Sequence, residues 1–359
     1  MNAGKLTVDL GSRSYPIHIG YSLLGSVGEI VKGVFGGQKA MVVTNPTVRS
    51  LYGEIIRAGL EKAGIFPVMA EMPDGEEYKA LSTAERMYDL AYGYELDRQT
   101  PILALGGGVV GDLAGFVAAT YLRGVPFVQI PTTLLAQVDS SVGGKVAVNH
   151  PRGKNIIGAF YQPTAVIADL AALETLPARE IRAGLAEVIK YGVIADGEFF
   201  GWLEQNLEKA LNLEPGVMQE IVTVSCRIKA AVVREDETDR GIRAILNFGH
   251  TVGHAVESLT NYKIYHHGEA VAIGMSAAAR MAFRMGLIGR QEKDRVVSLL
   301  VRAGLPVDVP ADLDRKELIR AMHRDKKVIS SRLTFVLPVA IGKVEILRDV
   351  QEEIVLYGL

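Results

Sequence analysis

Cysteine is almost absent from this sequence of 359 residues, in which Cys226 is the only one. A single cysteine cannot form a disulfide within the chain, and it cannot supply the several thiolates of a structural zinc site. A chain without disulfides is typical of a reducing compartment. We therefore expect a cytoplasmic protein.

The sequence also lacks a long apolar run and an excess of charge of one sign. No stretch of about 18 uninterrupted apolar residues is available to cross a bilayer, and residues 1–10 lack the apolar segment of a signal peptide. The formal net charge is -2, whereas binding to a nucleic-acid backbone needs a basic field. Nucleic acids and membranes are therefore not expected partners.

What the chain does contain is a globular composition, with 48% hydrophobic and 22% charged residues. Its length predicts about two domains. In the first half, short β-branched runs alternate with segments of helical periodicity, which is typical of a mostly parallel sheet covered by helices. The expected strands are 39–44, 66–72, 101–106, 126–131 and 165–169, and the expected helices include 50–63 and 80–92.

After Asp169 the pattern changes to longer helical segments. We place the domain boundary near Leu176, so that the fold class is α/β, with a mostly parallel sheet over 1–176 and a largely α-helical domain over 177–359. The expected helices are 180–193, 214–234, 242–259, 269–285 and 290–303, followed by a hairpin of strands 333–337 and 343–347.

Glycines gather after the strand 101–106, where the chain reads GGGVVGD over 106–112. Glycine lets backbone N–H groups approach an anion, and the start of a following helix adds partial positive charge. The spacing matches G-x-G-x-x-G, but the acidic residue expected about 20 positions later is missing. Cofactor binding and a tight structural turn both remain compatible with this loop. Asn45 and the turn 74–79 could contact an adenosine ribose instead.

A second polar and glycine-rich segment covers 139–155 and contains Lys145, Lys154 and Asn155. Neither lysine has the upstream glycine or the following Ser or Thr of a Walker A loop, which excludes a kinase-type phosphate loop. Two lysines and an amide within one short segment favour a pocket for a substrate phosphate over a solvated basic loop.

The most informative segment is 242–259. Arg243, Asn247, His250 and His254 follow one another at steps of four, three and four, so a helix would place them on one stripe. A polar stripe on an otherwise apolar helix indicates a functional face.

Histidines at i and i+4 can share a metal ion, and the pattern is not the H-E-x-x-H of a metalloprotease. The third ligand could be His267, Glu269 or Glu187. Nitrogen and oxygen ligands without a thiolate suit a catalytic metal with an open position.

Together these segments resemble the 3-dehydroquinate synthase family of sugar phosphate cyclases. The resemblance extends from the turn at Asp74 to the segment Asp325-Lys326-Lys327. Its most specific stretches are GGGVVGDLAGF over 106–116, PTTLLAQVDSSVGGK over 131–145, GLAEVIKYG over 184–192, NFGHTVGH over 247–254 and HGEAVA over 267–272.

The resemblance implies a Rossmann-like NAD-binding domain over 1–176, a helical metal- and substrate-binding domain over 177–359, and an active site in the cleft between them. It implies a homodimer and Zn²⁺, or Co²⁺ in its place, on Glu187, His250 and His267. His254 would then act near the phosphate or in proton transfer. The implied NAD contacts are Asp74, Gly75, Glu76, Glu77, Tyr78, Lys79, Gly108, Val109, Val110, Gly111, Asp112, Thr132, Thr133, Lys145, Lys154, Ala172, Leu173, Glu174 and Thr175, with Asn45 added as a ribose contact.

The resemblance also implies the residues that bind and convert the substrate. The family usually has Glu four residues before the arginine of the stripe, where this chain has Asp239, and a carboxylate one methylene shorter could still orient a water or accept a proton. The implied substrate contacts are Arg123, Asp139, Lys145, Asn155, Lys190, Lys229, Arg243, Asn247 and His254, with Lys326 or Lys327 closing the site; the implied catalytic residues are Asp239, His254, Lys145, Lys190, Arg243 and Asn247.

The implied reaction converts 3-deoxy-D-arabino-heptulosonate 7-phosphate into 3-dehydroquinate and phosphate, a step of the shikimate pathway to the aromatic amino acids. Transient oxidation at C5 by NAD, with zinc as Lewis acid, makes the C6 proton acidic so that phosphate can leave. The hydride then returns, and an intramolecular aldol step closes the ring.

Three alternatives lead to different chemistry. A cyclase of the inosose or valiolone type acts on substrates without a carboxylate, whereas Arg243 and Lys229 favour an acid. A metal-dependent glycerol-type dehydrogenase releases NADH and has no use for the cluster of Lys145, Lys154 and Asn155. A non-catalytic binding protein needs no polar stripe with an open ligand position.

Overall fold

A computed structural model describes residues 4–325 and 333–359. Contacts divide the chain into two compact units, Met1–Leu176 with Met218–Thr238, and Pro177–Val217 with Asp239–Leu359. Helix α7 (Pro215–Glu235) begins in the second unit and continues in the first. A single boundary near Leu176 would place 218–238 in the helical domain, and this assignment is corrected because the segment packs within the first unit.

The first unit is built on a sheet whose strand order, over the described residues, is β1-β2-β9-β6-β5-β3-β4. The five strands expected from the sequence are present and parallel: β3 (Lys39–Thr44), β4 (Phe66–Glu71), β5 (Ile102–Gly106), β6 (Phe127–Pro131) and β9 (Ala165–Asp169). The sequence analysis missed β1 (Gly4–Val8) and β2 (Tyr15–Gly20), which pair with each other antiparallel, while β2 runs parallel to β9.

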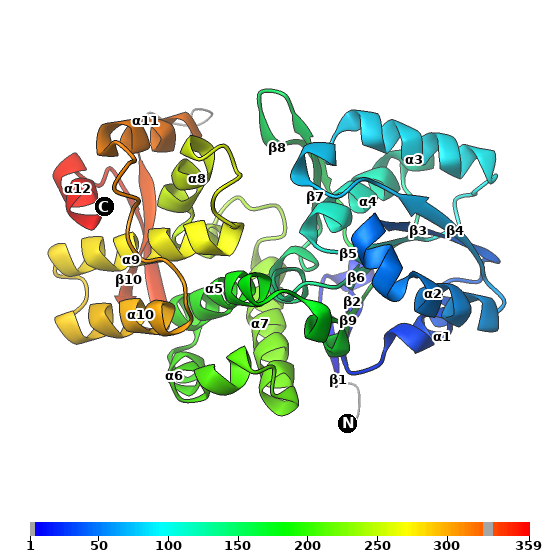
Figure 1. Cartoon of the computed structure of the whole chain (residues 1–359), viewed down its shortest axis with the longest axis horizontal. Coiled ribbons are helices and arrows are strands. Elements are labelled where there is room, and N and C mark those ends of the chain that lie inside the picture. The colour runs from blue at the N-terminus through cyan, green and yellow to red at the C-terminus, as the bar shows by residue number, and fades with distance from the viewer. Residues whose placement is uncertain (1–3, 326–332) are drawn as a thin grey trace. The chain divides into compact units, whose positions relative to one another are not determined.

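Helices cover both faces of this sheet (Figure 1). Along β3, Ala40 and Val42 point into one core with α1 (Val27–Val34) and α2 (Pro46–Lys62), while Met41 and Val43 point into the other. That second core contains side chains of α3 (Leu81–Gly93) and α4 (Gly108–Thr120). A strand that is buried on both faces needs a continuous apolar run, which is the pattern that the sequence carries.

A hairpin of β7 (Lys145–His150) and β8 (Gly153–Phe160) occupies the segment for which the sequence indicated only a polar, glycine-rich loop. Val146 and Val148 of β7 are buried in the core beside α4, whereas most of β8 is exposed. The hairpin is therefore anchored by β7, whereas β8 exposes Asn155 together with the apolar Ile156 and Phe160.

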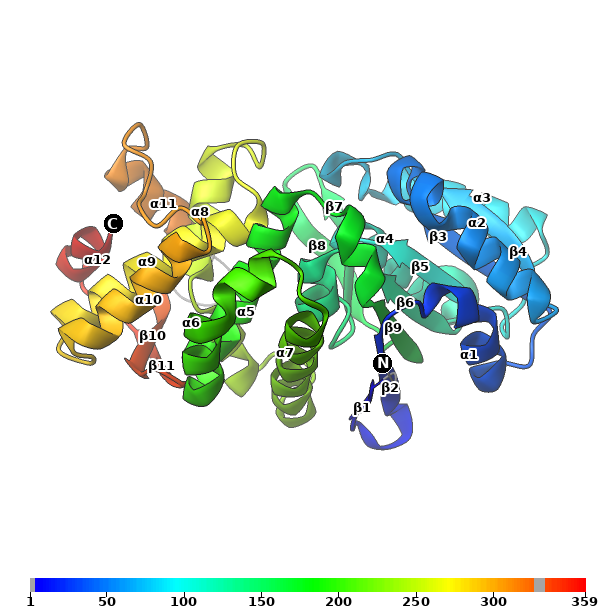
Figure 2. The same ribbon diagram turned by 60° about the horizontal axis from the view of Figure 1, so that its bottom comes forward.

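The second unit is mostly helical and has α9 (His267–Arg284) at its centre (Figure 2). Helix α9 contacts α5 (Ala178–Ala195), α8 (His250–Leu259), α10 (Arg290–Arg302) and α12 (Glu352–Gly358), and also β10 (Thr334–Ala340). The unit is completed by α6 (Gly197–Leu211), α11 (Arg315–Asp325) and β11 (Lys343–Arg348), which pairs antiparallel with β10 as expected. Over the described residues, no helix is long and apolar enough to cross a membrane.

The predicted helix 242–259 is interrupted. Ile242–Asn247 forms the 3-10 helix η7, and α8 begins only at His250, because Gly249 adopts the left-handed region with φ 81°. A Cβ at Gly249 would come within 2.7 Å of the Val271 carbonyl of α9. The prediction that the four polar residues form one stripe on a single helix was therefore wrong, since Arg243 and Asn247 lie on a different element from His250 and His254.

Candidate metal centre and phosphate pocket

Glu187, His250 and His267 converge on one point inside the second unit. His250 Nε2 lies 3.9 Å and His267 Nε2 3.7 Å from Glu187 Oε1. Their ligand atoms form one of two groups in the described residues that are close enough together to hold a metal ion. The ring centroids of the two histidines are 5.3 Å apart.

The Glu187 carboxylate fits a divalent cation. It is completely buried, with 0% of its surface exposed, and it contacts the ammonium group of Lys190 one turn further along α5. Apart from this ion pair, neither oxygen has a hydrogen-bond partner in the described part of the chain. A buried carboxylate is costly unless its charge is compensated, and two imidazoles with a carboxylate form a typical catalytic zinc set.

Small residues let the helices approach closely enough to bring these ligands together. A Cβ at Gly268, next to His267, would overlap the carbonyl of Ala183 on α5, one turn before Glu187. A Cβ at Gly274 of α9 would overlap the carbonyl of Gly249, next to His250. Substitution at either glycine would therefore push apart the helices that carry the three ligands.

Neighbouring acceptors orient the two histidine rings. His250 Nδ1 lies 3.1 Å from the Phe248 carbonyl oxygen, and His267 Nδ1 lies 3.3 Å from Glu257 Oε1. When Nδ1–H donates to such acceptors, the Nε2 lone pair is directed towards the Glu187 carboxylate, an arrangement common for metal-binding histidines.

The pKa values of the two histidines are shifted in opposite directions. Burial, reinforced by the charge of Lys190, holds the pKa of His250 well below its usual value, so this ring is neutral and able to bind metal. Burial alone would lower the pKa of His267, but the hydrogen bond and charge of Glu257 outweigh it and raise the pKa.

The other candidates for a third ligand are excluded or reassigned. Both Glu269 oxygens accept hydrogen bonds from Arg179 at 2.7 Å, and one also accepts the His266 backbone N–H. His254 lies one turn after His250, with its ring centroid 5.3 Å from that of His250. It belongs with Glu257 and His267 to the second group of potential ligands.

In the first unit, most of the predicted cofactor residues follow the carboxyl ends of parallel strands. Ligands of open α/β sheets bind at this edge. Several of these residues also shape the local backbone: Asn45 caps α2 by accepting the Val48 N–H at 2.9 Å, Asp74 accepts the Thr47 hydroxyl at 2.9 Å, and Thr133 accepts the Ala136 N–H at 3.1 Å. The predicted cofactor residues that follow these strands are Asn45 after β3, Asp74–Lys79 after β4, Gly108–Asp112 after β5, Thr132–Thr133 after β6 and Ala172–Thr175 after β9.

An ion-pair network connects the loop 74–79 with α4. The Lys79 ammonium lies 3.0 Å from Glu76 Oε1 and 3.0 Å from Asp112 Oδ2. Burial alone would lower the pKa of Lys79, but the two carboxylates more than compensate and raise it. Burial raises the pKa of Asp112, and Lys79 partly offsets this effect. Lys79 is therefore a fixed cation that ties the two loops together.

Two of the predicted phosphate residues, Lys145 and Asn155, share a hollow of about 310 Å³ on the hairpin β7–β8. Its lining includes Lys145, Asn155 and Asp112. Lys154 lies nearby, with its ammonium 3.8 Å from Glu76 Oε1. One cation, one amide and the Asp112 carboxylate near the start of α4 thus line the same space.

The remaining predicted substrate residues occupy varied environments. Lys229, which is 5% exposed, donates to both the backbone and side-chain oxygens of Asp139 at 2.7 Å. Arg243 is 2% exposed, whereas Asn247 on the same 3-10 helix is exposed. Arg123 and Asp239 have left-handed backbones, with φ 69° and 58°. Lys326 and Lys327 lie outside the described residues.

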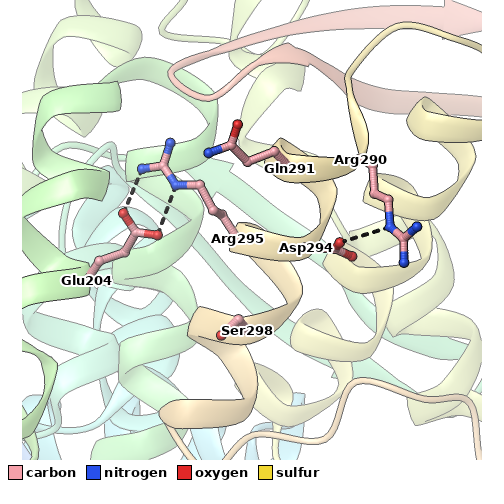
Figure 3. A pocket seen from close by; sticks show the side chains of 6 residues that line it. All are labelled: Glu204, Arg290, Gln291, Asp294, Arg295 and Ser298. Carbon is pink, nitrogen blue, oxygen red and sulfur yellow. Dashed lines mark hydrogen bonds and ion pairs between the residues drawn. The ribbon is translucent and has the colours of Figure 1, made fainter.

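A second hollow, of about 580 Å³, lies between α6 and α10 and contains none of the predicted site residues (Figure 3). Its arginines already have partners: Arg295 forms two hydrogen bonds with Glu204, and Arg290 pairs with Asp294. Gln291 and Ser298 complete the lining. We assign no site to this hollow.

Sequence reasoning missed two residues that support the site, Glu257 and Asn149. Glu257 follows His250 by seven positions, so the two lie on one face of α8. That spacing was readable in the sequence. The contacts of Asn149 emerge only once β7 and β8 are paired, because its partner Glu76 lies far away in the sequence.

Comparison with known proteins gives one consistent group of relatives. Residues 69–183 match the 3-dehydroquinate synthase N-terminal family, and residues 184–328 match the corresponding C-terminal family. The chain is 55% identical over 349 residues to a 3-dehydroquinate synthase of Desulforamulus reducens, covering 97% of each chain. It is 57% identical over 338 residues to that of Pelotomaculum thermopropionicum, covering 94% of this chain and 91% of the relative.

Solved structures of similar fold include two sugar phosphate cyclases. A 2-epi-5-epi-valiolone synthase from Streptomyces hygroscopicus, solved with NAD⁺ and Zn²⁺, has a TM-score of 0.89 at 27% identity and covers 98% of this chain and 97% of its own. A 2-deoxy-scyllo-inosose synthase, solved with carbaglucose-6-phosphate, NAD⁺ and Co²⁺, has a TM-score of 0.90 at 28% identity and covers 98% of both chains. A probable glycerol dehydrogenase from Sinorhizobium meliloti shares the fold alone, with a TM-score of 0.65 at 17% identity, and covers 88% of this chain and 91% of its own.

Proposed function

The chain belongs to the 3-dehydroquinate synthase family and is a phosphate-eliminating cyclase of that class. On this basis we propose which of its residues carry out each part of the reaction. The substrate is 3-deoxy-D-arabino-heptulosonate 7-phosphate, and the products are 3-dehydroquinate and phosphate. The observation that carries the proposal is the convergence of the ligand atoms of Glu187, His250 and His267 on one point beside the fully buried Glu187 carboxylate.

Glu187, His250 and His267 would hold Zn²⁺, or Co²⁺ in its place. The donor set supports this, since two imidazoles and one carboxylate leave an open position for a substrate oxygen. When bound, the cation supplies Lewis-acid polarisation and NAD supplies a hydride acceptor and donor. Lys190, whose ammonium contacts Glu187, would bind a substrate hydroxyl beside these ligands.

NAD would bind along the carboxyl edge of the sheet in the first unit. Glycines at the start of α4 support this, because a Cβ at Gly111 would approach Gln129 Oε1 of β6 to 2.8 Å and loosen the helix from the sheet. The proposed contacts are Asn45, Asp74, Gly75, Glu76, Glu77, Tyr78, Lys79, Gly108, Val109, Val110, Gly111, Asp112, Thr132, Thr133, Lys145, Lys154, Ala172, Leu173, Glu174 and Thr175.

Lys145 and Asn155 would hold the leaving phosphate. Their shared hollow supports this, since an ammonium group and an amide N–H are suitable donors for phosphate oxygens. Arg123 is exposed and follows α4 in the chain, and its guanidinium would bind the same phosphate. His254 would hold or pass a proton near the departing phosphate.

Arg243 would bind the substrate carboxylate, with Asn247 on the same 3-10 helix as a hydrogen-bond partner. A nearly buried guanidinium, 2% exposed, supports recognition of an anion. Lys229 and Asp139 would act as a pair, because each already contacts the other at 2.7 Å. Asp239 would orient a water molecule or accept a proton in place of the usual glutamate. That Lys326 closes the site remains a prediction.

A cyclase of neutral sugar phosphates is the second candidate, and its solved examples share the fold at 27% and 28% identity. Measuring phosphate release from the acid substrate, glucose 6-phosphate and sedoheptulose 7-phosphate separates the two candidates. We expect the neutral substrates to have kcat/KM lower by about 10⁴-fold, because they lack the carboxylate that Arg243 would bind.

Arg243→Gln should remove most of this preference, whereas Arg227→Gln, at an exposed arginine of α7, should keep it. Comparable turnover of a neutral sugar phosphate by the wild type would contradict the substrate assignment and leave the metal centre standing.

We also propose a cytoplasmic homodimer. The lone, buried Cys226 supports a reducing compartment. Membership of the family supports the dimer.

A further inference from the structure

The hairpin β7–β8 contains a bulge opposite Asn149. Val148 pairs with Ile157, but the next pair is His150 with Gly153, so three residues on β8 face one residue on β7. Those three are Lys154, Asn155 and Ile156. Asn155 has φ 54°, a left-handed conformation that asparagine tolerates better than most residues. Bulges of this kind redirect side chains and are frequent next to active sites.

The Asn149 side chain connects this bulge to the loop 74–79. Its Oδ1 accepts the Asn155 backbone N–H at 2.9 Å. Its Nδ2 donates to the Glu76 carbonyl at 3.2 Å and to Glu76 Oε1 at 2.8 Å. One N–H on one side and two oxygens on the other determine which atom of the amide faces which partner.

Three further contacts extend this connection. The Asn149 backbone N–H donates to the Lys79 carbonyl at 2.7 Å, and the two strand segments form a parallel bridge at Ala80. Glu76 and Asp112 each lie 3.0 Å from the Lys79 ammonium. A continuous set of contacts therefore runs from Asp112 to Asn155, and it passes through the Asn149 amide.

We propose that Asn149 is a positioning residue that fixes the phosphate-binding bulge relative to the cofactor loop. The inference rests on the proposed function, in which Asn155 holds the phosphate and Glu76, Lys79 and Asp112 contact NAD. The reaction oxidises one carbon and expels phosphate from a nearby one, so the two groups of residues must be held at a fixed separation. A side chain that bonds to both loops supplies this without touching the substrate.

Two substitutions distinguish the contact made by Oδ1 of Asn149 from the contacts made by its Nδ2. Asn149→Ala removes both contacts, and Asn149→Asp keeps the acceptor for the Asn155 N–H but places a second carboxylate against Glu76. With Asn149→Ala we expect about 10-fold increases in the NAD dissociation constant and in the substrate KM at saturating NAD, with a smaller change in kcat. With Asn149→Asp we expect the NAD constant to rise at least as much, but KM to stay within about threefold of wild type.

The fold should survive, because the backbone bond to Lys79 and the flanking strand pairs remain. The matched control is Asn206→Ala, which removes a side-chain amide that donates to the Trp202 carbonyl on α6; it should leave both constants unchanged. Hydrogen exchange of the peptide 150–160 provides a readout that is independent of activity. Exchange should accelerate in Asn149→Ala and stay slow in Asn149→Asp.

Unchanged NAD affinity and KM in Asn149→Ala would overturn the inference, and so would equal exchange rates in the two variants. If the wild type releases no phosphate from the acid substrate, the proposed function fails. The exchange and NAD-binding measurements would then still decide whether Asn149 holds the two loops together.

Discussion

Replacing His250 by alanine should remove the bound metal and lower kcat/KM by about 10³-fold or more. The remaining ligands, Glu187 and His267, would leave the cation with two of its three protein donors. Polarisation of a substrate oxygen by a bound cation contributes several kcal/mol to the transition state, and each factor of ten corresponds to about 1.4 kcal/mol. The measurements are metal content after gel filtration, metal affinity by chelator competition, and phosphate release.

His323→Ala is a suitable control, because this histidine is exposed on α11 of the same unit. Glu187→Gln extends the test, since it keeps the size of the side chain and removes the charge. Wild-type metal content in His250→Ala would refute the assigned ligand set.

Lys145→Ala and Asn155→Ala should each lower kcat/KM by about 10²–10³-fold. Donors aimed at charge that develops on a leaving group typically contribute about 2–4 kcal/mol. The leaving phosphate gains charge as its C–O bond breaks, so both side chains should matter more in the transition state than in the ground state. The loss should therefore appear in kcat as well as in KM, because the same side chains would also hold the phosphate before it leaves.

Lys62→Ala is the matched control for Lys145→Ala, because Lys62 is also exposed and lies at the end of α2 in the first unit. Metal content and NAD affinity of Asn155→Ala should stay close to those of the wild type. Activity within a few-fold of wild type in both variants would contradict the phosphate pocket.

The parallel sheet was predictable because its central strands are largely apolar, although β6 contains the buried Gln129. Ala40 to Val43 alternate between two cores, which requires buried side chains on both faces. The antiparallel pair of β1 and β2 was harder to predict, since the polar Lys5 and His18 interrupt the apolar pattern of these two strands. The hairpin β7–β8 was missed because its glycines and charges also suit a loop.

Helical periodicity failed where tertiary contact determines the backbone. The steps between Arg243 and His254 fit a continuous helix, but the close approach of α9 requires a left-handed Gly249. The continuation of α7 into the first unit also depends on a long-range contact, the pair of Lys229 with Asp139. Neither contact leaves a local signal in the sequence.

The candidate site, too, was only partly predictable from the sequence. Histidine spacing indicated a metal, but residue patterns left Glu187, His267 and Glu269 open as the third ligand. The structure removes Glu269, because Arg179 and the His266 N–H engage its carboxylate. The helical spacing of Glu257 from His250 could be read from the sequence, whereas the contacts of Asn149 with Glu76 became visible only from distances.

The most direct test of the central claim is the ratio of phosphate to NADH. The protein is incubated with 3-deoxy-D-arabino-heptulosonate 7-phosphate, Zn²⁺ and NAD in catalytic amount, while phosphate and absorbance at the NADH band are followed together. We predict phosphate equal to the substrate consumed, without a matching rise in NADH, because the hydride is returned within each cycle. NADH that accumulates in proportion to product, without release of phosphate, would show a dehydrogenase and contradict the account.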